Sequence, residues 1–149
     1  MEMVQRRGVT STVRDTNAEL GANAKLVLTE KLLTHGSQTA ISNMKVELKG
    51  EGSSVQVISR SVAQDDSVQV FNPLVIGECA CRGHVQCDAI IMDEGIVGAR
   101  PEITANSVEA SLIHEAAIGK IAGEQLNKLM TLGLTEKEAE QKIIEGFLK

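Results

Sequence analysis

Apolar residues up to about residue 112 recur at every second position. Clean alternation appears at 45–49, 54–57, 67–70 and 107–110, where Val, Leu or Ala alternates with Lys, Glu, Gln or Ser. Such alternation points one set of side chains inward and the other outward, as in a half-buried strand. Clusters of Gly, Ser and Asp separate these segments. The pattern predicts seven or eight short strands.

The motif Ser-Val-Gln-Val occurs twice, at 54–57 and 67–70, thirteen positions apart. A repeat at short period is typical of stacked rungs in a solenoid or of strands in a sandwich. The composition favours the solenoid, because Phe71 and Phe147 are the only aromatic residues while 42% of the chain is hydrophobic. Thin rungs leave little room for rings and are filled well by Val, Ile and Ala. We therefore predict a mainly β core built as a solenoid.

From about residue 115 the apolar period changes to that of a helix. The apolar residues between 118 and 130 share one helical face. Gly133 suits the left-handed end of a helix, and Thr135 with Glu138 forms a capping-box pattern before a second helix. Phe147 falls on the apolar face of that second helix and is predicted to anchor it. We expect a C-terminal helical hairpin.

Length and charge narrow the class of protein. The 149 residues predict one structural unit, which we divide into a β core over 1–112 and a helical region over 113–149. A net charge of −5 and two aromatic residues argue against a nucleic-acid partner. The sequence predicts no membrane contact, because it lacks a long apolar window and its N-terminus lacks the apolar run of a signal peptide.

Cys79, Cys81 and Cys87 fall close together, which is not the spacing of a disulfide framework. We infer a reducing, cytoplasmic location with free thiols or a metal site. Thiolates and imidazoles suit zinc, copper or iron–sulfur chemistry, although a buried Cys also behaves as a small hydrophobe. His114 and Glu115 form a second candidate cluster at the expected strand-to-helix junction. The sequence shows no phosphate-binding loop, nucleophile elbow or zinc-protease motif, so we expect no enzyme.

An ordered set of motifs fills the chain from about Asn72 to Phe147. In order they are Gln86–Ile91, Gly98, Pro101–Ile103, His114–Ile121, Glu124–Leu126, Leu132–Ala139 and Gly146–Phe147. Taken with their spacing, these motifs resemble the SufB/SufD family of iron–sulfur cluster assembly proteins.

The resemblance implies a right-handed β-helix followed by helices, which acts as a scaffold for transient iron–sulfur clusters. It implies that SufB pairs with SufD through the β-helices and that each binds a SufC ATPase through its helical region. It places the cluster-assembly thiol at Cys87, with His114 and Glu115 as further candidates and Cys87 and His114 as metal ligands. Cys79 and Cys81 match no family motif and are additional thiol candidates.

The resemblance also has departures. Glu115 after the histidine looks more like SufB, and the presence of both Cys87 and His114 looks like short archaeal-type members that work as homodimers. We therefore expect a homodimer or a SufB/SufD-type heterodimer. Ile113 stands where SufB commonly has an acidic residue, and residues 127–128 replace two aromatic positions. The chain begins late and stops early relative to the family, which fits a fragment, a split gene or a minimal scaffold.

Two alternatives stay open. Val85, Ile91, Val97 and Ile103 recur at every sixth position, the period of hexapeptide acyltransferases, although Glu109 interrupts the series. The other alternative is a non-catalytic solenoid interaction module in which Cys87 is inert. In either β-helix the open edge favours association, so we expect a dimer or larger assembly.

Overall fold

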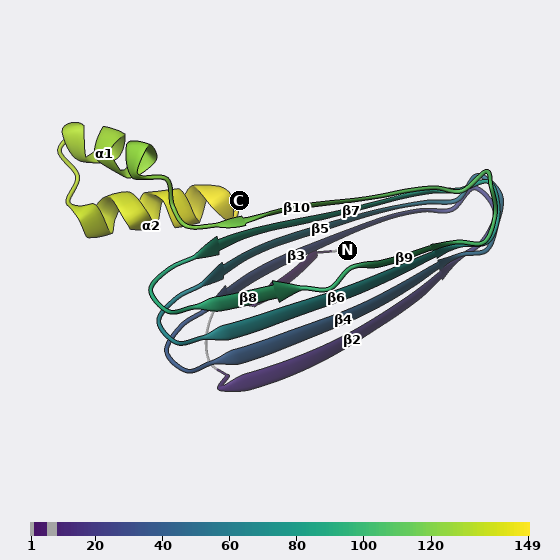
Figure 1. The fold of residues 1–149 in the computed structure, drawn as a ribbon, viewed down its shortest axis with the longest axis horizontal. Coiled ribbons are helices and arrows are strands. Elements are labelled where there is room, and N and C mark those ends of the chain that lie inside the picture. The colour runs from purple at the N-terminus through teal and green to yellow at the C-terminus, as the bar shows by residue number, and fades with distance from the viewer. Residues whose placement is uncertain (1, 6–8) are drawn as a thin grey trace.

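The chain forms a parallel β-solenoid with a helical hairpin at one end (Figure 1). This computed structural model describes residues 2–5 and 9–149, with side chains described from residue 9 onward. The predicted fold class, a mainly β solenoid followed by a C-terminal helical hairpin, is confirmed.

The strands alternate between two sheets. The first sheet contains β1 (Glu2–Gln5), β3 (Lys25–Thr34), β5 (Ser54–Ala63), β7 (Arg82–Ile91) and β10 (Ser111–Gly119), paired in that order. The second contains β2 (Ser11–Leu20), β4 (Thr39–Leu48), β6 (Val68–Gly77) and β8 (Ile96–Ala99), and β9 (Glu102–Ala105) also pairs with β6. The helices are α1 (Gly123–Thr131) and α2 (Glu136–Phe147).

Each half-turn of the solenoid is one strand and one corner. The long strands of the two sheets begin at nearly even intervals along the chain, as the starts of β3, β4 and β5 at Lys25, Thr39 and Ser54 illustrate. Within a strand, every second side chain enters the space between the sheets. Leu28 and Leu48 fill that space and are at most 2% exposed. Aliphatic residues thus build the core, as the composition indicated.

The corners are tight because selected residues adopt left-handed backbone conformations. Positive φ angles occur at Asn23 and Gly52 in the corners that precede the first sheet's strands, and at Gly36, Asp65 and Asp93 in the corners that follow them. Gly, Asn and Asp tolerate this conformation better than other residues. The corners also bond to each other: the Gly36 amide donates to Asp65 Oδ2 over 2.6 Å, and the Asp65 amide donates to Asp93 Oδ2 over 3.2 Å.

The repeated Ser-Val-Gln-Val motif does not mark equivalent positions. In the first copy Val55 and Val57 are buried in the core, whereas in the second copy Gln69 is the buried residue and Val68 lies on the outer face. The first copy starts with β5 at Ser54, but the second starts one position before β6, which begins at Val68. A shift of one position exchanges the two faces of a strand. The motif therefore indicated the correct fold class, although its spacing of thirteen positions is not the period of the structural repeat.

The six-residue series is not the structural repeat either. Val85 and Ile91 lie on β7, Val97 on β8 and Ile103 on β9, in two different sheets. The pairing of β7 with β5 sets Val85 opposite Val57, so equivalent positions on stacked turns are far more than six positions apart. The architecture therefore lacks the period on which the acyltransferase alternative depends.

The helical region begins later than the apolar period predicts. β10 continues to Gly119 and α1 begins at Gly123, so residues 113–119 form a strand and not a helix. β10 pairs with β7 in parallel from Ser111 opposite Arg82 to Gly119 opposite Ile90. This continuous pairing outweighs the helical spacing that includes Ile118, because tertiary contacts routinely override local propensity.

Helix α2 begins and packs as predicted. The Thr135 hydroxyl accepts a hydrogen bond from the Glu138 amide, and the Glu138 carboxylate accepts one from the Thr135 amide, completing the capping box. The helix lies against the first sheet, where Ile144, Leu148 and the partly buried Phe147 surround Val62. Among the described helices, none is long and apolar enough to span a membrane.

Candidate functional site

Cys87 and His114 lie side by side on the inner face of the first sheet. Cys87 is on β7 and His114 on β10, where the parallel register sets Cys87 opposite Ala116 and His114 opposite Val85. The two residues are therefore diagonal neighbours on one face. Cys87 Sγ and His114 Nε2 are 3.4 Å apart, within hydrogen-bonding distance for sulfur. The structure thus brings together two residues that the sequence separates by a complete turn of the solenoid.

Both groups are electrically neutral near pH 7. Burial raises the pKa of the Cys87 thiol to about 12, and the carboxylates of Asp88 and Glu30 add to this effect. Burial lowers the pKa of His114, and His84 lowers it further while Glu115 opposes the change. The resting pair is therefore a thiol beside an uncharged imidazole. A cation that approaches the sulfur favours the thiolate and so promotes loss of the proton.

Glu115 does not join this pair. Successive residues of a strand point to opposite faces, so Glu115 lies on the outer face while His114 lies on the inner one. There the Glu115 carboxylate is 3.4 Å from Nε2 of His84 on β7. The sequence predicted His114 and Glu115 as one cluster, and the strand separates them. His84, which that prediction did not include, is the residue that Glu115 meets.

Cys79 and Cys81 lie in the corner between β6 and β7, away from Cys87. The extended chain from Cys81 to Cys87 corresponds to about 20 Å. Cys81 is buried in the core, and its Sγ fills the space beside Gly77, where an added methyl group would approach it to 2.9 Å. Burial raises the pKa of Cys79, whose Sγ lies 3.6 Å from the Leu48 carbonyl. In this structure both thiols serve the packing of the corner.

A buried charge cluster on the same inner face was not predicted from the sequence. Glu30 on β3 is only 2% exposed, and its carboxylate lies 2.8 Å from Arg14 Nη1. The hydroxyls of Ser42 and Ser59 donate to the same carboxylate over 2.6 and 3.3 Å. A buried carboxylate needs such partners, because removing it from water is otherwise costly.

This cluster is aligned with the thiol. The parallel registers set Glu30 opposite Ser59 and Ser59 opposite Cys87, so the three residues form one row across β3, β5 and β7. The alternation of Leu28, Glu30 and Leu32 could have revealed the cluster, because it places a charged residue on an apolar face. The Glu30 carboxylate in this row contributes to the raised pKa of Cys87.

The pair offers two metal ligands. A thiolate and an imidazole both bind iron, zinc and copper. In the part of the chain that the structure describes, no group of three or more His, Cys, Asp or Glu side chains could hold a metal ion. A complete coordination shell therefore needs ligands from the bound species or from another chain.

The fold and the site together define a class of protein: a two-sheet β-solenoid that carries a thiol–imidazole pair on its last two turns. Residues 5–147 match the family model described as "SUF system FeS cluster assembly, SufBD core domain". The chain belongs to the SufBD family. The match extends well upstream of Asn72, where the resemblance in the sequence motifs begins.

Curated relatives carry the same family name. The chain is 35% identical over 132 residues to an iron–sulfur cluster assembly SufBD family protein of Methanothermobacter thermautotrophicus, covering 86% of this chain and 32% of the relative. It is 37% identical over 107 residues to one from Pyrococcus horikoshii (70% and 24%) and 34% identical over 109 residues to one from Archaeoglobus fulgidus (72% and 30%). The chain thus spans about a quarter to a third of the length of these relatives.

Proposed function

We propose that the chain is a scaffold component of a SUF-type iron–sulfur cluster assembly complex, in which Cys87 and His114 hold the nascent cluster. The observation that carries this proposal is the 3.4 Å contact between Cys87 Sγ and His114 Nε2. Family membership supports it, because the matching model and the relatives are named for iron–sulfur cluster assembly. The cluster is cargo, and ATP hydrolysis belongs to a partner rather than to this chain.

The protonation of the pair suits cargo that binds and leaves. At rest the raised pKa of Cys87 keeps the thiol protonated. Binding of ferrous iron favours the thiolate, and the neutral imidazole beside it can accept the proton or ligate the metal. Two protein ligands leave the other positions for sulfide and for a partner chain. A site with so few permanent ligands releases its cluster more readily than a closed cysteine cage.

We propose that a second solenoid, either another copy or a SufD-type chain, covers β10. In the described part of the chain, β10 pairs with β7 on one side and with no strand on the other. Ile113 and Ile118 on this strand are 53% and 40% exposed. An unpaired apolar edge favours strand pairing between chains. Light scattering should give a dimer, and Ile113→Lys should shift it toward monomer; a monomeric parent protein contradicts this part.

We propose that the helical hairpin binds a SufC-like ABC-type ATPase. Met130 and Leu132 at the end of α1 are 40% and 73% exposed, and the family resemblance assigns ATPase docking to this region. Leu132→Asp should abolish co-purification with a co-expressed SufC-type ATPase, whereas Ile113→Lys should not.

The three free thiols fit a reducing compartment, and we place the complex in the cytoplasm.

Anaerobic reconstitution with ferrous iron and sulfide tests the site. The parent protein should develop the visible absorbance of an iron–sulfur cluster, and Cys87→Ala and His114→Ala should lose most of it. Cys79→Ala is the matched thiol control and His84→Gln the matched imidazole control, because each keeps the Cys87–His114 contact. Equal absorbance in all variants contradicts the site. No absorbance in the parent protein supports the alternative of a non-catalytic interaction module.

A further inference from the structure

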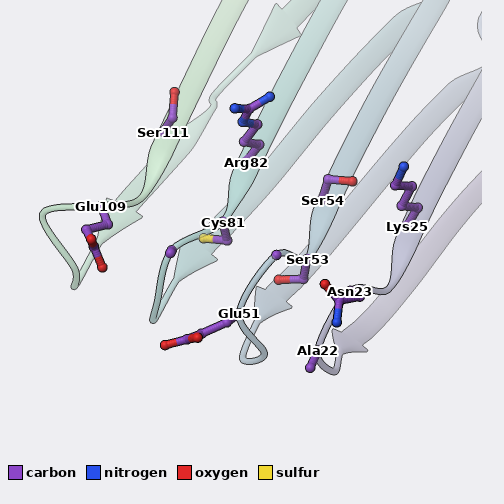
Figure 2. Close-up of a pocket in the computed structure, with 12 residues that line it drawn as sticks. Ala22, Asn23, Lys25, Glu51, Ser53, Ser54, Cys81, Arg82, Glu109 and Ser111 are labelled. Carbon is purple, nitrogen blue, oxygen red and sulfur yellow. The ribbon is translucent and has the colours of Figure 1, made fainter.

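A broad surface hollow lies far from the thiol–imidazole pair. It has a volume of about 990 Å³ and lies along the corners that lead into β3, β5, β7 and β10 (Figure 2). Arg82 at the start of β7 lines it, five positions before Cys87, which corresponds to about 17 Å of extended chain. Arg82 faces outward, whereas Cys87 faces the interior. The hollow is therefore separate from the proposed cluster site.

Four polar side chains form a row at this hollow. The parallel registers set Lys25 opposite Ser54, Ser54 opposite Arg82, and Arg82 opposite Ser111, on the outer face of four adjacent strands. Neighbouring strands are about 4.8 Å apart, so the backbones of Lys25 and Arg82 are about 10 Å apart with the Ser54 hydroxyl between them. Both long side chains can reach a small ligand placed over Ser54.

The row has no partners within the described part of the chain. None of its four side chains has a hydrogen bond or an ion pair to another described residue. By contrast, Arg14, Lys45, Lys49 and Lys142 each contact a carboxylate. Other described cations such as Arg60 also lack an ion pair, so the distinguishing feature of this row is that two cations and two hydroxyls lie on adjacent strands.

The carboxylates at the hollow form no ion pair with the row. Figure 2 shows Lys25 and Arg82 rising from the strand starts, whereas Glu51 and Glu109 leave their corners in the opposite direction. Ser53 also lines the hollow, and its buried hydroxyl interacts with the Cys79 thiol. The side of the hollow next to the strands thus offers hydrogen-bond donors and positive charge.

We propose that Lys25, Ser54 and Arg82 bind a tetrahedral oxyanion, either inorganic phosphate or the phosphate group of a small ester. A guanidinium can donate two parallel hydrogen bonds to a phosphate, and an ammonium adds a point charge from the other side. The Ser54 hydroxyl donates between them, and Ser111 extends the row of donors. A planar carboxylate fits this arrangement less well, because it offers two acceptor oxygens to three converging donors.

Titration with sodium phosphate, followed by two-dimensional amide NMR of the full chain at constant ionic strength, tests the site. We expect saturable shifts confined to residues 23–25, 52–54, 80–82 and 109–111. Arg82→Gln should weaken phosphate binding about tenfold or more, because charge-assisted hydrogen bonds are lost, and Lys25→Gln should also weaken it. Arg60→Gln is the matched control, because Arg60 lies on the outer face of the same sheet, away from this hollow.

Each outcome decides the proposal. Binding of phosphate, sulfate or glycerol phosphate with weak binding of acetate supports a tetrahedral oxyanion site, and the ratio of phosphate to glycerol phosphate affinity identifies the source. Shifts that never saturate, that prefer acetate, or that survive in Arg82→Gln overturn it. Equal weakening in Arg60→Gln also overturns it, since that result indicates non-specific attraction. The readout uses neither iron nor sulfide, so it is independent of the proposed cluster function.

Discussion

The middle turns of the solenoid and its C-terminal end follow the same strand pattern but differ in burial. In one register row, Ser61 on β5 and Ala89 on β7 are each 7% exposed, whereas Ile118 on β10 is 40% exposed. All three residues are at inward positions of their strands. The difference arises because a further strand covers β5 and β7, while β10 has none beyond it in the described part of the chain.

This difference places the Cys87–His114 pair at the boundary between the covered and the uncovered strands of the first sheet. Cys87 lies on the last covered strand and is 5% exposed, so burial raises its pKa. His114 lies on the first uncovered strand and is half-buried. One member of the pair is thus shielded from water while the other is reachable from the open end. A solenoid needs no separate cleft for such a site, because the end of the stack supplies the transition from core to solvent.

The largest expected effect is a loss of stability when a buried side chain in the middle turns is shortened to alanine. Leu28 on β3 is 2% exposed, so Leu28→Ala should lower the free energy of unfolding by about 3 kcal/mol through lost burial and a residual cavity. In the Ile113→Lys variant, which we expect to be monomeric with β10 uncovered, Ile118→Ala should cost only about 1 kcal/mol, because its side chain already contacts water. Denaturant unfolding of both variants measures the difference. Equal losses would show that another chain covers β10 in solution.

The next effect concerns the buried charge cluster in the middle turns. Arg14→Met leaves the Glu30 carboxylate buried without its ion-pair partner and should cost about 2–3 kcal/mol. The Arg14→Met, Glu30→Met double variant should regain much of that loss, because it removes the unpaired charge as well. Lys142→Met, which breaks an exposed pair with Glu145, should change stability by less than about 0.5 kcal/mol. If the stability losses of the two single variants simply add in the double variant, Arg14 and Glu30 are not energetically coupled.

A smaller effect tests whether the boundary residue Cys87 behaves as buried. Its pKa is raised from 9.0 to about 12 in the folded chain, so the unfolded chain releases the thiol proton first as pH rises. The stabilising contribution is complete below pH 9 and is lost between pH 9 and pH 12. The parent should therefore lose about 1 kcal/mol more than Cys87→Ala between about pH 9 and pH 10. If the parent protein and Cys87→Ala lose stability equally as pH rises, the Cys87 thiol is in contact with water.

Local patterns in the sequence were sufficient for the solenoid. Alternation marked inward and outward residues, and the scarcity of rings favoured thin aliphatic rungs. Gly133, Thr135 and Glu138 signalled the hairpin, because capping and left-handed helix ends depend on neighbouring residues. Cys87 and His114 were predicted as site residues through the family resemblance, but their contact within one chain was not, since no local pattern shows that residues a full turn apart share one face.

The remaining features depend on register, which the sequence does not display. Residues 113–119 have a helical apolar spacing, yet the exposed pairing edge of β7 makes them a strand. That assignment sends Glu115 to the outer face and away from the pair. The row of Glu30, Ser59 and Cys87 and the row containing Arg82 likewise appear only when the strands are aligned.

The smallest expected effect lies in the helical hairpin. Thr135→Ala removes the side-chain half of the capping box on α2 and should cost about 0.5 kcal/mol. Thr131→Ala is the matched control, because that hydroxyl bonds to the Lys128 carbonyl within its own helix and caps no free amide. Amide exchange should quicken in α2 of Thr135→Ala while β5 keeps its protection, since α2 rests on Val62 without forming the core. Faster exchange throughout β5 would instead show that the hairpin and the solenoid unfold as one cooperative unit. The open end would then be stabilised by α2 as well as by strand pairing.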